Sequence, residues 1–149
     1  MNTLRRIVKF VSMPLSEKLL MGEAVVYLLW YSLLIYTMPY RWWESRIGQK
    51  MQPWKQEGLT PGQMKQAAPI RRGVFRANKV LFGLGKCFAL SLTIKQMLKK
   101  RGIESTLYLG VKKGQPDSLL AHAWLKCGDI TVYGGREAAK HYRELVVYT

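Results

Sequence analysis

Gly-Leu-Gly-Lys-Cys at residues 83–87 opens the stretch that decides the fold, and Ala-His-Ala-Trp-Leu at residues 121–125 lies near its end. Between them, apolar residues recur every three or four positions over residues 87–100, which predicts a helix that starts at Cys87. Basic residues fill the last turn and Gly102 follows, as is common at helix ends. The sequence thus places a cysteine at a helix start and a histidine, His122, on a later element.

An antiparallel sheet is predicted after this helix. Residues 105–111 and 119–127 alternate between two side-chain sets, and Gly128 and Asp129 form a tight turn before a returning strand at 130–133. The tail from residue 136 suggests one or two helical turns and a last short strand at 144–148. We therefore predict an α+β domain in which N-terminal helices and a small antiparallel sheet pack on the Cys87 helix.

Residues 19–38 are almost all apolar, and Pro39 ends this run. Its uninterrupted part, residues 24–38, would form about 22 Å of helix, which is shorter than the roughly 30 Å hydrocarbon core of a bilayer. This length, with Glu23 before it, favours burial in the domain or in an assembly. The alternative is an interfacial or spanning helix, supported by Trp30, Trp42 and Trp43, so membrane contact through this segment stays open.

Residues 48–62 contain several Pro and Gly residues and predict a linker. It divides a hydrophobic and aromatic helical segment with its linker (1–60) from a core domain (61–149). A second helical pattern covers residues 63–84. Its outward Arg and Lys residues are more typical of a solvated basic face than of a dedicated binding face.

The composition fits one ordinary domain of 149 residues with 48% hydrophobic content. The formal charge of +15 indicates an acidic or phosphate-bearing partner or an anionic membrane face. No long run of like charges is present, so we expect no nucleic-acid partner. Two cysteines are too few for a disulfide framework, and no signal peptide is recognised, so we expect a cytoplasmic protein, with a position at the inner face of the membrane left open.

Cys87 is a candidate nucleophile because of its place at the helix start. Unsatisfied backbone N–H groups and the positive end of the helix dipole favour a thiolate there, and Lys86 adds positive charge. Gly83 and Gly85 let the chain turn sharply before the helix. The N–H groups around Cys87 could then serve as an oxyanion hole. A structural role for a lone cysteine is the competing interpretation.

His122 is the candidate base. Strand alternation puts His122, Trp124 and Lys126 on one face of the sheet and Ala123, Leu125 and Cys127 on the other. We expect Cys127 to face the opposite layer as an inert core thiol and His122 to face the helix end that carries Cys87. A nucleophile and its base need to meet in space and not in sequence.

These residues resemble a known family. The run Lys86-Cys87-Phe-Ala-Leu-Ser-Leu, the strand Leu107-Tyr-Leu-Gly-Val-Lys-Lys and the motif Ala121-His-Ala-Trp-Leu are similar to the lasso-peptide leader peptidases. These are the protease half of the split B maturation proteins, in the transglutaminase-like, papain-like cysteine-protease superfamily. The similarity covers residues 15 to about 145.

The resemblance implies that Cys87 attacks a peptide carbonyl of the precursor and that His122 acts as base and then as acid. The released core peptide would pass to a separate ATP-dependent lasso cyclase, and a small leader-recognition protein would deliver the precursor. No cofactor and no metal enters this scheme.

One position departs from the family pattern. The family carries an aspartate about a dozen residues after the histidine, where this chain has Tyr-Gly-Gly at 133–135. The nearest acid is Asp129, which is a candidate third catalytic residue or a simple turn residue. Either Asp129 orients the imidazole, or another group such as a backbone carbonyl does, or activity is reduced.

Two other functions stay open. The same cysteine chemistry supports acyl or amide transfer, in which an amine takes the place of water. Alternatively, the chain is a non-catalytic basic scaffold that holds an acidic peptide or a membrane-bound assembly.

Overall fold

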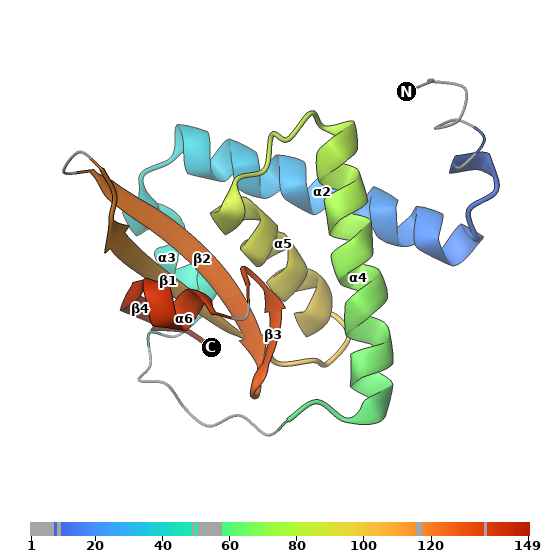
Figure 1. Cartoon of the computed structure of the whole chain (residues 1–149). Helices are drawn as coiled ribbons and strands as arrows, with labels where there is room; N and C mark the ends of the chain where they lie inside the picture. Colours follow the sequence, from blue (N-terminus) through green and yellow to red (C-terminus); the bar gives the residue numbers. More distant parts are fainter. Residues whose placement is uncertain (1–7, 9, 49, 51–57, 116–117, 136) are drawn as a thin grey trace.

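Helix α5 (Cys87–Lys99) lies at the centre of the fold in the computed structural model (Figure 1). The structure describes residues 8, 10–48, 50, 58–115, 118–135 and 137–149. The side chains of Trp43 and Arg46 are outside this description. Nine of the 13 residues of α5 are buried, so the helix is covered on most sides. Apolar positions on several faces of a helix are typical of a helix surrounded by other elements.

Four antiparallel strands form one sheet in the order β3-β2-β1-β4. The strands are β1 (Thr106–Lys113), β2 (Leu119–Cys127), β3 (Ile130–Tyr133) and β4 (Arg143–Tyr148). The last strand pairs with β1 and so joins the edge opposite β3. The predicted strands are therefore found, and the short tail strand completes the sheet.

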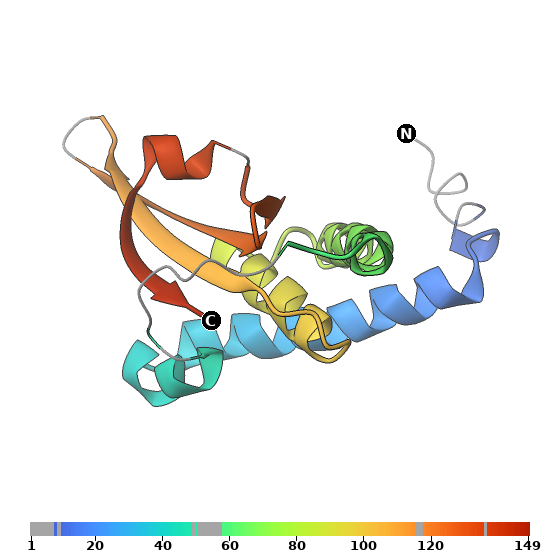
Figure 2. The same cartoon turned by 90° about the horizontal axis from the view of Figure 1, so that it is seen from below.

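Different helices pack on the two faces of the sheet. One face packs on α5 through a core cluster that includes Leu107, Leu125 and Tyr148. The other face carries a smaller cluster beneath the short helix α6 (Ala138–His141), made by Tyr108, Trp124, Ala138 and Val147. Figure 2 shows the sheet between α6 on one side and α5 with α2 on the other.

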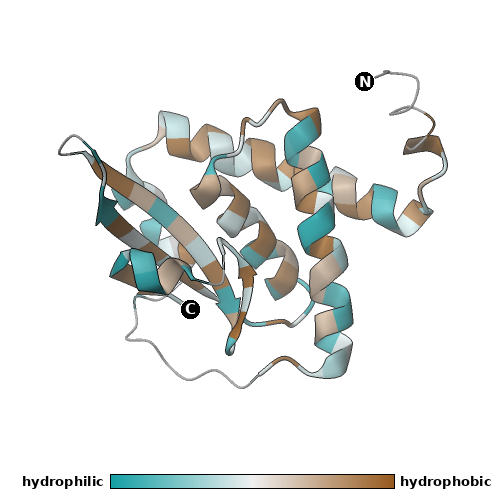
Figure 3. Cartoon of the chain, viewed as in Figure 1, coloured by the Kyte–Doolittle hydropathy of each residue, from teal (hydrophilic) through white to brown (hydrophobic). Residues whose placement is uncertain are grey.

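Two long helices flank α5 on the side away from the sheet. Helix α2 (Leu15–Thr37) contacts both α5 and α4 (Pro61–Val80). The start of α4 is fixed by a capping box, in which Thr60 and Gln63 each bond the other's backbone N–H. Figure 3 shows that hydrophobic residues run along most of α2, whereas α4 carries many hydrophilic ones.

The α+β class and the packing of helices and an antiparallel sheet on the Cys87 helix are confirmed. The expected burial of the N-terminal helix is wrong in part, because only Ala24, Leu28 and Ser32 of α2 are buried. Pro39 ends α2 as expected, but it also precedes a further short helix, α3 (Tyr40–Ile47), which the sequence pattern did not predict.

The second helical pattern begins two residues earlier than expected, at Pro61, and ends at Val80. Residues 49 and 51–57 of the expected linker lie outside the described residues. The division of the chain at residue 60 stays a prediction.

Candidate active site

Cys87 is the first residue of α5, and its side chain is partly buried against the edge of the main core cluster. Lys86 is the N-cap residue, and its side chain makes no capping hydrogen bond in this described part of the chain. Backbone N–H groups at a helix start have no partner within the helix, so they are directed at whatever lies beyond it. The thiol of Cys87 therefore sits beside donors that suit a developing negative charge.

The loop before Cys87 is held by Asn78 of α4. The side-chain amide of Asn78 accepts a hydrogen bond from Gly85 N (2.9 Å) and donates one to Gly85 O (3.3 Å). A Cβ atom on Gly85 would lie 2.6 Å from Leu28 Cδ1 and 3.1 Å from Asn78 Oδ1, so a larger residue would require the buried Leu28 side chain to shift. Helices α2 and α4 together thus fix the backbone two residues before the thiol.

Phe82 lies in the same loop and is the non-glycine residue with positive φ among those described, at 52°. Its ring is 99% exposed. A left-handed backbone conformation is strained for an aromatic residue, and a fully exposed phenyl ring gains nothing from burial. The surrounding loop therefore presents an apolar side chain to solvent near the start of α5.

His122 lies on β2 opposite Gly110 of β1, and its ring is half-buried. The ring contacts Tyr142 at a centroid distance of 5.0 Å and Trp124 at 6.4 Å. Its Nε2 atom lies 2.8 Å from the backbone carbonyl oxygen of Gly134. These contacts give the imidazole one defined orientation.

The bond to Gly134 also fixes the tautomer of His122. A carbonyl oxygen only accepts hydrogen bonds, so Nε2 must be the protonated nitrogen. Nδ1 of the neutral ring is then the unprotonated nitrogen and is able to accept a proton. A general base for a thiol requires this arrangement.

Gly134 cannot be exchanged for an acid on this backbone. Its φ is +95°, and a Cβ atom there would lie 2.3 Å from Trp124 Cβ. The chain passes so close to β2 that only glycine fits, and the close approach brings the Gly134 carbonyl to the imidazole. A backbone carbonyl thus lies where the resemblance led us to expect a carboxylate.

The alternation of β2 is confirmed, but our assignment of its faces is wrong. Ala123, Leu125 and Cys127 pack in the core cluster with α5, whereas His122 shares a face with Trp124 beneath α6. Small and apolar side chains suit the dry contact with α5 better than an imidazole, which needs hydrogen bonds.

Cys87 and His122 nevertheless approach the same segment of chain. β3 pairs with β2 at residues 125–127, so within the described chain no strand pairs with the outer edge of β2 at His122. His122 contacts Gly134 there, and the preceding residue, Tyr133, is the one near Cys87. In the described structure the thiol and the imidazole are not hydrogen-bonded to each other, and such bonds are often long before a substrate binds.

Tyr133 links the two candidates and was missed at the level of sequence. Its ring packs on Phe75 at 5.7 Å, on the α5 side of the sheet. Burial, and secondarily a negative charge on Cys87, raises the pKa of Tyr133 to about 12. Tyr133 thus lies near Cys87, and the next residue, Gly134, holds His122. The hydroxyl therefore keeps its proton at neutral pH.

The remaining candidates lie elsewhere. Asp129 is exposed in the turn between β2 and β3, at the far end of β2 from Leu119, and the contact made by His122 Nε2 is with Gly134. Cys127 is 1% exposed, and burial raises the pKa of its thiol to about 11. Within the described ranges, no cluster of three or more His, Cys, Asp or Glu side chains could hold a metal ion.

A family model described as the transglutaminase-like superfamily matches residues 34–147. Because this range covers most of the chain, the protein belongs to the transglutaminase-like superfamily, which includes cysteine proteases. The range contains Cys87, His122 and Gly134. Searches of curated proteins and of solved structures returned no match.

Proposed function

We propose that the protein is a cysteine peptidase that removes the leader from a lasso-peptide precursor. The observation that carries this proposal is the hydrogen bond between His122 Nε2 and Gly134 O, which leaves Nδ1 unprotonated as a base. Membership in a superfamily with cysteine proteases and a half-buried cysteine at the start of α5 support it. The resemblance of the Cys87 and His122 motifs to leader peptidases supplies the substrate class.

The first half of the reaction forms a thioester. His122 Nδ1 takes the proton of the Cys87 thiol as sulfur attacks the scissile carbonyl carbon. The backbone N–H groups at the start of α5 stabilise the oxyanion of the tetrahedral intermediate. The imidazolium then gives its proton to the leaving amine, and the core peptide departs with a new amino terminus.

The second half hydrolyses the thioester. Water attacks the acyl carbon while His122 Nδ1 accepts a proton, and the sulfur leaves and regains its proton from the imidazolium. The Gly134 carbonyl stabilises the imidazolium through its dipole but contributes no full negative charge. We therefore expect slower turnover than a carboxylate at this place would give.

The proposed partners follow from this role. A small leader-recognition protein presents the precursor, and an ATP-dependent cyclase receives the freed core peptide. The net charge of +15 suits an acidic peptide or an acidic partner surface. We assign the reaction to the cytoplasm, where the precursor is made.

The decisive test compares two matched cysteine variants. The precursor and the recognition partner are incubated with wild-type protein, Cys87→Ala or Cys127→Ala, and the products are identified by mass spectrometry. Wild type and Cys127→Ala are expected to release leader and core peptide, and Cys87→Ala to lose about 10⁵-fold in rate or more. Retained cleavage by Cys87→Ala would rule out the proposal.

The same assay separates the alternatives. Acyl transfer would give a leader that carries an added amine in place of a free carboxylate. A scaffold without catalysis would bind the precursor but leave it intact in all three samples. The scaffold reading is supported by the exposed apolar surface of α2.

A further inference from the structure

Helix α2 exposes a continuous apolar stripe on the side away from the core. Its members lie on one side of the helix, because most steps between them are three, four or seven residues, and each is between 44% and 71% exposed. Together they form what we call the outer stripe: Leu15, Leu19, Val26, Leu29, Trp30, Leu33 and Tyr36. Contiguous exposed apolar surface of this kind is unusual on a protein that is surrounded by water alone. We therefore expect the outer stripe to be covered by a binding partner.

The acidic residues of α2 face the other way. Glu17 pairs with Arg76 of α4, and Glu23 pairs with Arg101 (2.7 Å) and Lys100 (3.3 Å) beyond the end of α5. No charged side chain thus interrupts the outward surface from Leu19 to Tyr36. The acids hold α2 to the domain and leave its outer stripe uncharged.

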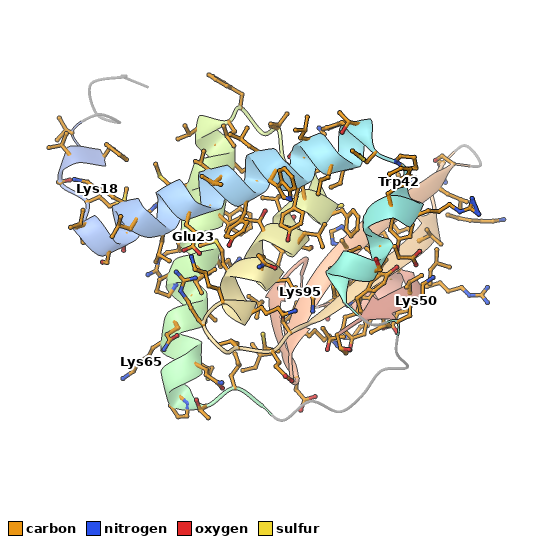
Figure 4. All side chains as sticks on the ribbon, turned by 180° about the vertical axis from the view of Figure 1, so that it is seen from behind. Lys18, Glu23, Trp42, Lys50, Lys65 and Lys95 are labelled. Atoms are coloured by element: carbon orange, nitrogen blue, oxygen red, sulfur yellow. The ribbon has the colours of Figure 1, made fainter. Side chains whose placement is uncertain are left out.

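Charged and aromatic residues flank the two ends of the stripe. Lys18 lies beside its beginning, and exposed Arg41 and Trp42 follow its end. Figure 4 shows α2 across the near face of the molecule, with Lys18 at one end and Trp42 at the other. Tryptophan and tyrosine favour the boundary between lipid and water, and a chain of net charge +15 is attracted to anionic lipid.

Length alone would let α2 cross a membrane. It has 23 residues, or about 35 Å of helix, and is long and apolar enough to cross a bilayer. However, Ala24 and Leu28 are fully buried against the domain, and Glu23 is ion-paired to it. Spanning would require breaking these contacts, whereas lying in the plane of the interface keeps them.

We propose that the outer stripe of α2 docks the protein on an anionic lipid bilayer, with the helix parallel to the surface. The apolar side chains enter the boundary between headgroups and acyl chains, while Lys18, Arg41 and the overall positive charge contact the headgroups. Helices α4 and α5 and the sheet stay on the aqueous side.

Vesicle co-sedimentation tests this docking. Wild-type protein is mixed with vesicles of phosphatidylcholine alone or of phosphatidylcholine and phosphatidylglycerol in equal parts. The test variant Val26→Asp/Leu33→Asp places charge in the stripe, and the matched control Leu119→Asp/Leu145→Asp places charge on exposed leucines of the sheet. We expect wild type and control to sediment with anionic vesicles and the test variant to bind at least about tenfold more weakly.

Two outcomes overturn the proposal. One is wild-type protein that stays in the supernatant with anionic vesicles. The other is a self-association in sedimentation velocity that Val26→Asp/Leu33→Asp abolishes in the absence of vesicle binding, because the stripe would then be covered by a second copy. Circular dichroism checks that both double variants are folded. Since Cys87→Ala is expected to bind vesicles like wild type, this test is independent of the peptidase assay.

Discussion

The two cysteines differ in exposure, in their place on a helix or a strand, and in their neighbours. Cys87 begins a helix, is partly exposed, and lies near Tyr133 and a loop fixed by Asn78. Cys127 ends a strand, is 1% exposed, and lies near the buried amine of Lys95.

A cysteine at a helix start and a cysteine at a strand end are thus expected to have opposite roles, one as a reactive thiol and one as an inert core residue. At the start of α5, backbone donors and a mobile substrate can both approach the sulfur. At the end of β2, packing against α5 excludes both, and burial disfavours the thiolate of Cys127. The following changes act on one region or the other, and the largest expected effect comes first.

Removing the base should nearly stop the chemistry at Cys87. We expect His122→Ala to lower the cleavage rate by about 10³-fold, because the variant loses the group that we propose takes the thiol proton. Added imidazole should restore part of the rate. His141, the second histidine of the chain, is exposed beside Glu137, and His141→Ala serves as the matched control with an unchanged rate. Equal rates for the two variants would contradict the role of His122.

Releasing the loop before Cys87 should have a smaller effect. Asn78→Ala removes both hydrogen bonds to Gly85, so we expect cleavage to slow by about tenfold to a hundredfold through misplacement of the thiol. Asn78→Asp keeps the acceptor for Gly85 N and should fall between wild type and the alanine variant. Lys79→Ala, at the exposed neighbouring position, should match wild type. A wild-type rate for Asn78→Ala at unchanged stability would show that the two Asn78 hydrogen bonds to Gly85 do not position the thiol.

The Cys127 region should respond in stability and not in catalysis. Burial, with repulsion from Lys99, lowers the pKa of Lys95 from 10.5 to about 8, and its Nζ donates to Ser105 O. Between these values the unfolded chain binds more protons than the folded one, so the contribution of Lys95 to stability rises from pH 8 to pH 10.5.

Lys95→Met removes this titration. We expect the variant to be more stable than wild type near pH 7, because no amine needs to be charged in the core. Its advantage should shrink by up to about 3 kcal/mol as the pH rises to 10.5. Urea unfolding at several pH values measures it. If the stability advantage of Lys95→Met stays constant or grows with pH, the protonation of Lys95 does not differ between the folded and unfolded chains as proposed.

Asp129 should matter least. It is exposed in the turn after β2, and His122 is held by Gly134 instead. We expect Asp129→Asn to leave the cleavage rate within about twofold of wild type, as for most surface substitutions. A large loss would return Asp129 to the site as the third catalytic residue.

Local pattern was enough to predict most of the elements. The helix from Cys87 was expected to end at Lys100 and ends at Lys99, and the strand at 119–127 agrees with β2. Here periodicity and the flanking glycines are local signals that tertiary packing does not override. The helix start at Thr60 could also have been found, because Thr60 and Gln63 form a recognisable capping box.

The composition of the site could not be predicted in the same way. Alternation separates His122 from Cys127, but it does not say which face of the sheet meets α5. The group that orients His122 is the backbone carbonyl of Gly134. Because every residue has a backbone carbonyl, the sequence does not mark this one as a partner of the histidine. Tyr133 becomes relevant only because β3 folds back beside β2 and brings its ring near Cys87.

The most direct test of the account compares the two thiols in one molecule. Wild-type protein is treated with iodoacetamide near neutral pH, and peptide mass spectrometry follows the alkylation of Cys87 and Cys127 over time, with His122→Ala as a second sample. We predict that Cys87 is modified at least about a hundredfold faster than Cys127 and that His122→Ala slows Cys87 alone. Equal rates at the two cysteines, or a Cys87 rate unaffected by His122→Ala, would contradict a Cys87 nucleophile activated by His122.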